Sequence, residues 1–141
     1  LSDPLEEHTL SLLLHHPDLR PQALALTPHH FQRAENGEIF ALWRRYGIIE
    51  AIKDHADDLL ATHLDRLLQK PLPPSDTHQR AEALAQCLRR LEERRLRGLK
   101  AEEELRLSQG EGVEEVMEQA VGLNLSLRAL FQEGAKTPRS G

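Results

Sequence analysis

Apolar residues recur at helical spacing along most of this chain, and this pattern constrains the fold more than any other feature. The clearest case is the stretch from Ile48 to Gln69, where apolar residues repeat with a period near 3.6. Aromatic residues make up only 4% of the sequence, so leucine and alanine must form most of the core. Strands favour β-branched and aromatic residues. We therefore predict an all-α fold, with residues 48–69 as one long helix or two abutting helices.

Prolines and helix-capping residues divide the first half of the chain into short helices. A capping acid followed by Pro4 opens a first helix, which Pro17 ends. A further helix is predicted over Ala34–Tyr46, and the prolines of residues 71–74 then interrupt helical structure. We predict a compact helical bundle over residues 1–74.

The second half has a different character. Asp76 and Gln79 form a capping-box pattern ahead of a long, highly charged helix. After a glycine-containing turn, a last helix is predicted from Val113 to about Gln132. Two long antiparallel helices joined by a short turn form a helical hairpin. We assign this long helix and hairpin to residues 75–133 and expect residues 134–141 to be a disordered tail.

Composition limits the classes of function. The formal net charge of −5 argues against a surface dedicated to nucleic acid. The segment from Arg89 to Arg97 is rich in arginine, but Glu92 and Glu93 interrupt it. This mixture of charges favours a solvated helix, with ion pairs such as Arg89–Glu93, over a nucleic-acid-binding segment. The one cysteine, Cys87, excludes an internal disulfide and suits a reducing cytoplasm. We expect a cytoplasmic protein without direct nucleic-acid or membrane binding.

Candidate chemistry is sparse. His15 and His16 are adjacent and would project about 100° apart on a helix, so they are poorly placed to chelate one ion. Cys87 is predicted to be a small buried apolar residue. Serine-nucleophile motifs and glycine-rich phosphate loops are absent from the sequence. We therefore expect no catalytic, cofactor-binding or metal-binding residues in this chain.

The last predicted helix has an apolar stripe wider than a two-helix hairpin needs. Surplus apolar surface of this kind is typical of partner binding, although the face could also fold back on the bundle, and the residue pattern leaves both open. The residues that we assign to partner binding are Val116, Ala120, Leu123, Leu127, Leu130 and Phe131.

The N-terminal third is similar to a known family. A leucine-rich helix ends in His16-Pro17-Asp18-Leu19; Pro28-x-x-Phe31 follows, and then a helix with Ile39-Phe40 and a terminal Gly47. These motifs resemble the C-terminal helicase-binding domain of bacterial DnaG-type DNA primases. They are mainly packing and turn residues, and the rest of the chain agrees only in its expected architecture.

The resemblance implies a non-catalytic module of a replicative primase in bacterial DNA replication. Such a module would dock on the N-terminal domains of the hexameric replicative helicase and stimulate it, while zinc and magnesium would belong to upstream primase domains. Met117 is the only methionine, so we expect the chain to be part of a longer protein. The alternatives are the N-terminal domain of the helicase itself, an unrelated helical interaction scaffold and, more distantly, a metal-dependent hydrolase.

Overall fold

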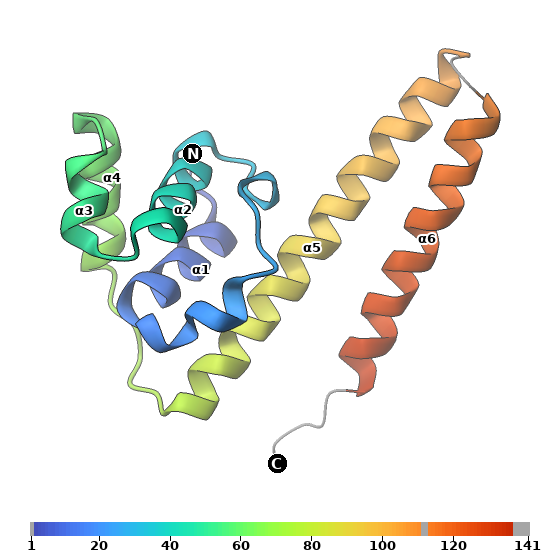
Figure 1. Cartoon of the computed structure of the whole chain (residues 1–141). Coiled ribbons are helices and arrows are strands. Elements are labelled where there is room, and N and C mark those ends of the chain that lie inside the picture. The colour runs from blue at the N-terminus through green and yellow to red at the C-terminus, as the bar shows by residue number, and fades with distance from the viewer. Residues whose placement is uncertain (1, 111–112, 137–141) are drawn as a thin grey trace. The chain divides into compact units, whose positions relative to one another are not determined.

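The computed structural model describes the backbone of residues 2–110 and 113–136 and the side chains of residues 2–110 and 118–132. The chain is all-α, as predicted, and no strand occurs within these ranges (Figure 1). The α-helices are α1 (Pro4–His15), α2 (Ala34–Tyr46), α3 (Ile49–Asp54), α4 (Asp58–Gln69), α5 (Thr77–Ser108) and α6 (Val113–Lys136). Two 3₁₀ helices, η1 (Pro17–Ala23) and η2 (Pro28–His30), connect α1 to α2.

Local sequence signals account for most helix ends. Asp3 caps α1, because its Oδ1 accepts a hydrogen bond of 3.1 Å from the backbone N–H of Glu6. Gly47 ends α2 with φ of 72°, a left-handed conformation that favours glycine. The predicted capping box at the start of α5 is confirmed, because Asp76 and Gln79 exchange backbone-to-side-chain hydrogen bonds of 2.9 and 2.7 Å.

The segment 48–69 forms two helices rather than one. α3 ends at Asp54, and α4 begins after Asp57, whose Oδ1 accepts a 2.8 Å hydrogen bond from the N–H of Leu60. An aspartate in the N-cap position stabilises a new helix start, so the break carries its own sequence signal.

The chain divides into two units, residues 1–91 and residues 92–141. We predicted the boundary at residue 74, but the structure places it inside α5. The difference has a packing cause: Leu84 and Leu91 of α5 are fully buried and belong to the core of the first unit. The prolines of residues 71–74 interrupt the helix without ending the unit.

The core of the first unit is built around α1. Four of its leucines, Leu10, Leu12, Leu13 and Leu14, are at most 5% exposed although they point in successive directions around the helix. A helix that is buried on all sides must be surrounded by other elements. Figure 1 shows α1 amid the other helices of this unit. An aromatic row of Phe31, Phe40 and Trp43 completes the core, with ring centroids 5.2 and 5.8 Å apart.

The second unit contains the C-terminal part of α5 and all of α6. The ammonium of Lys100 donates a hydrogen bond to the side-chain oxygen of Asn124, and the guanidinium of Arg97 lies 5.5 Å from the ring centroid of Phe131. Glu103 is only 6% exposed, and its Oε2 atom is buried without a hydrogen-bond partner among the described residues.

α6 continues to Lys136, about one turn beyond its predicted end near Gln132. The first residues of the expected disordered tail, 134–136, are therefore helical. Residues 137–141 of that tail lie outside the described range.

The arginine-rich part of α5 contains ion pairs between residues one helical turn apart. Arg95 pairs with Glu92 at 2.6 Å and Arg97 pairs with Glu93 at 2.7 Å, three and four residues apart. The predicted partner of Glu93 was Arg89, but the carboxylate pairs with Arg97 instead. Such pairs each stabilise an exposed helix by about 0.2–0.5 kcal/mol.

Candidate interaction surfaces

The predicted partner-binding residues of α6 differ in their exposure. Leu127 is only 9% exposed, so it belongs to the packing of the second unit. Ala120, Leu123 and Leu130 are half-buried, whereas Phe131 is 52% exposed. Val116 lies within α6, but its side chain is outside the described residues.

Two residues that we did not assign to partner binding are the most exposed large hydrophobic residues described in α6. Val121 and Leu125 are each 59% exposed, and they lie four residues apart on the same helix face. The four-residue spacing of Val121 and Leu125 could have been recognised in the sequence. We assigned the longer apolar stripe that includes Leu127 instead, and Leu127 faces inward. We call Val121 and Leu125 the α6 apolar face; Phe131, four residues after Leu127, lies on the side of α6 where Arg97 of α5 contacts its ring.

A buried carboxylate in the first unit holds two helices together. Glu6 of α1 is fully buried, and its carboxylate accepts hydrogen bonds from the backbone N–H groups of Gln32, at 2.7 Å, and Arg33, at 3.2 Å. These N–H groups lie at the start of α2, which has no side-chain cap of its own. A negative charge at a helix N-terminus satisfies unpaired donors and interacts favourably with the helix dipole. Glu6 therefore caps α2 from a different helix.

A chain of hydrogen bonds links Glu6 to α4, and the chemistry of each group determines which one donates and which one accepts. A carboxylate only accepts, so the Asn36 amide nitrogen must donate to Glu6, at 2.9 Å. The Asn36 carbonyl oxygen then faces His63 Nε2, at 2.6 Å, which must carry a proton to donate. His63 Nδ1 is left to accept from the Arg66 guanidinium at 3.1 Å. The network thus selects one neutral tautomer of His63. Arg66 in turn lies 3.5 Å from a carboxylate oxygen of Glu7.

This arrangement disfavours a charged His63. Burial lowers the pKa of His63 below 6.5, and the positive charge of Arg66 lowers the pKa further. A lowered pKa in the folded state means that the unfolded chain binds the proton more readily. The contribution of His63 to stability is therefore complete above pH 6.5. This contribution decreases as the pH falls from 6.5 to the folded-state pKa, and it does not change further below that pKa.

We expect His63→Gln to reduce the acid sensitivity of the first unit. The measurement is the free energy of unfolding by urea between pH 5 and pH 8, followed by Trp43 fluorescence, because Trp43 is the only tryptophan and lies in this core. Some pH dependence should remain, since burial also lowers the pKa values of His8 and His16. A wild-type stability that rises on acidification over this range would contradict the assignment.

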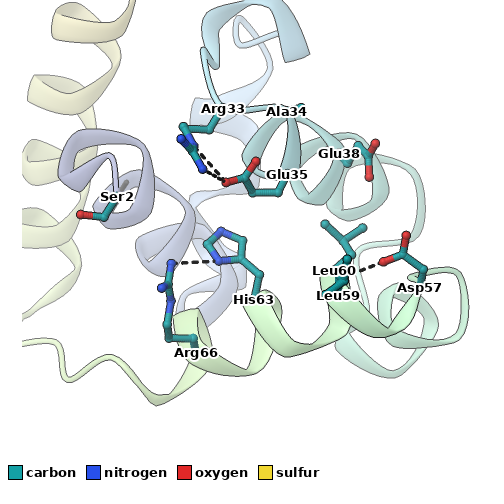
Figure 2. Close-up of a pocket in the computed structure, with 10 residues that line it drawn as sticks. All are labelled: Ser2, Arg33, Ala34, Glu35, Glu38, Asp57, Leu59, Leu60, His63 and Arg66. Atoms are coloured by element: carbon teal, nitrogen blue, oxygen red, sulfur yellow. Dashed lines mark hydrogen bonds and ion pairs between the residues drawn. The ribbon is translucent and has the colours of Figure 1, made fainter.

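A cavity of about 530 Å³ lies beside this network, between the first turns of α2 and the part of α4 that extends to Arg66 (Figure 2). Arg33, His63 and Arg66 lie at one end, and Glu38 and Asp57 lie at the other. Leu60 is buried next to the cavity, whereas its neighbour Leu59 is 85% exposed at the rim. No signal in the sequence brings these residues together, because they come from segments that are far apart in the chain.

The histidines of the opening stretch are placed differently. His8 and His16 line a smaller cavity of about 290 Å³, next to Pro73 and Pro74. His15 is exposed, with Nδ1 2.8 Å from the Ser11 carbonyl and Nε2 3.0 Å from the Leu68 carbonyl. Within the described residues, no three His, Cys, Asp or Glu side chains are grouped in a way that could hold a metal ion.

Cys87 is buried, as predicted, and burial raises the pKa of its thiol. A thiol with a raised pKa has little thiolate character and is a poor nucleophile.

Comparison with protein-family models, curated proteins and solved structures finds no match for this chain. Of the helices that the structure describes, none combines the length and apolar character that a bilayer-spanning segment requires.

Proposed function

We propose that this chain is the helicase-binding module of a bacterial replicative primase, and that it docks on the N-terminal domains of the hexameric replicative helicase. In this role the module is a non-catalytic cytoplasmic component of the replication machinery. It stimulates the helicase during primer synthesis, and the chemistry of primer synthesis belongs to other domains of the primase.

The N-terminal motifs support the family assignment, because each has a structural role that fits the resemblance. Pro17 follows the end of α1 and begins η1, and Leu19 is buried in the core. Phe31 and Phe40 stack on each other at the centre of the first unit. The resemblance therefore rests on residues that determine how this unit packs.

The α6 apolar face is the observation that carries the binding proposal. Val121 and Leu125 are each 59% exposed, and they lie four residues apart on one side of α6. Covering the exposed part of each of these side chains with a partner groove contributes about 1–2 kcal/mol, a little over half the value for a fully exposed side chain. The same helix carries Glu118 and Arg128 at exposed positions, which suits a polar rim.

We expect Leu125→Asp to weaken binding of the isolated N-terminal domain of a bacterial replicative helicase by at least about tenfold, because a charge would replace an apolar contact. Titration calorimetry measures this dissociation constant. Ser126→Asp is the matched control, since it adds the same charge at the next exposed position of α6. It should bind within about twofold of wild type, which is the scatter expected for a surface change.

Two results would contradict parts of this proposal. Failure of the wild-type chain to bind the helicase domain would contradict the function itself. Equal losses for Leu125→Asp and Ser126→Asp would contradict only the assignment of the contact to the α6 apolar face.

A further inference from the structure

The cavity between α2 and α4 has an exposed apolar side chain, Leu59, at its rim. Leu59 is the most exposed large hydrophobic residue among those described, at 85%, and it stands at the cavity rim. Leu60 is buried beside it and offers an apolar wall. An exposed leucine next to a hollow of about 530 Å³ is a feature that partner side chains can cover.

The arginines that line the cavity have carboxylate partners, whereas two of its carboxylates have no cationic partner among the described residues. Arg33 forms an ion pair of 2.8 Å with Glu35, and Arg66 is held by His63 and Glu7. The two carboxylates at the opposite end have no cationic partner in the part of the chain that the structure describes. These are Glu38 and Asp57; the carboxylate of Asp57 accepts a hydrogen bond from the backbone N–H of Leu60.

The cavity therefore presents uncompensated negative charge around an apolar wall. His63 adds no positive charge near neutral pH, because the network keeps its ring neutral. The complementary group is a cation on an apolar stem, which is the structure of a lysine or arginine side chain. An additional apolar side chain on the same partner would cover Leu59.

We propose that this cavity docks a basic amphipathic helix of a partner protein, with a lysine or arginine between Glu38 and Asp57 and a leucine-like side chain against Leu59. The first unit thereby has a docking surface of its own, separate from the α6 apolar face. Helices that place apolar and polar residues three or four positions apart present both groups on one side.

A synthetic helical peptide of leucine and lysine tests the proposal with the full chain. Its dissociation constant is measured by fluorescence anisotropy, and its site is located by amide shifts in nitrogen-15 NMR spectra. We expect Glu38→Gln combined with Asp57→Asn to weaken binding by about tenfold through loss of two ion pairs. Asparagine also caps helices well, so the start of α4 should be preserved.

The matched control is Glu50→Gln combined with Asp54→Asn, which makes the same charge change at exposed positions of α3 that do not line the cavity. This double variant should bind as wild type does. Leu59→Ser should weaken binding by about tenfold, because it removes the apolar contact. The same peptide with glutamate in place of lysine should not bind.

Three outcomes would overturn the proposal. Equal weakening by both double variants would indicate general attraction to an acidic protein. Shifts confined to residues outside α2 and α4 would place the peptide elsewhere. Shifts at the cavity that grow with protein concentration in the absence of peptide would identify a second copy of the chain as the occupant.

Discussion

Replacing Glu6 with alanine is expected to destabilise the first unit by about 2–4 kcal/mol, because it leaves one buried and two partly buried donors without an acceptor. The affected donors are the backbone N–H groups of Gln32 and Arg33 and the side-chain amide of Asn36. The substitution also removes the cap of α2. Urea unfolding followed by Trp43 fluorescence measures the change in the free energy of unfolding.

Two further variants separate the causes. Glu6→Gln keeps the size and one acceptor oxygen, but it turns the other end of the group into a donor, so an intermediate loss is expected. Glu50→Ala removes an exposed carboxylate and should change stability by no more than about 0.5 kcal/mol. A Glu6→Ala variant as stable as Glu50→Ala would show that the carboxylate does not hold α2.

Replacing Leu127 with aspartate is expected to destabilise the second unit by about 3 kcal/mol, because it puts a charge where a leucine is 91% covered. The helix content measured by circular dichroism should fall as α6 loses its packing. The unfolding transition seen by Trp43 should stay close to that of wild type, since Trp43 belongs to the core of the first unit.

Leu125→Asp is the comparison for this variant. It introduces the same side chain two positions earlier on α6, where the leucine is 59% exposed, and it should leave the circular dichroism unchanged. Equal loss of helix in both variants would mean that the exposed and buried sides of α6 are not distinct in solution. Loss in neither would mean that Leu127 contributes little to the packing.

Local structure was predictable because its causes lie within a few residues of each other. The start of α1 at Pro4, the capping box at Asp76 and the end of α2 at Gly47 each depend on neighbouring residues. The all-α class followed in the same way from periodicity and from the shortage of aromatic residues.

Features that depend on distant contacts were not predictable. Asn36 contacts Glu6 and His63, which are 30 and 27 residues away in the sequence. No spacing pattern links these residues, and a lone histidine on an amphipathic helix carries no sign of its partner. The same holds for the unit boundary, because the sequence of α5 does not reveal which of its turns pack on the first core.

The face of α6 was predictable only in part. Periodicity identified an apolar stripe, but it could not say which edge of the stripe is covered. The structure buries Leu127 and exposes Val121 and Leu125, so the exposed edge is offset from the predicted one. The docking partner remains a prediction from the resemblance of residues 5–47.

The unpartnered carboxylate of Glu103 has a consequence for the dynamics of the second unit. Its Oε2 atom is shielded from solvent and has no hydrogen-bond partner among the described residues, which is unfavourable for a polar atom. Whenever water reaches the last turns of α5, that penalty disappears, so local opening there is more frequent than packing alone would dictate.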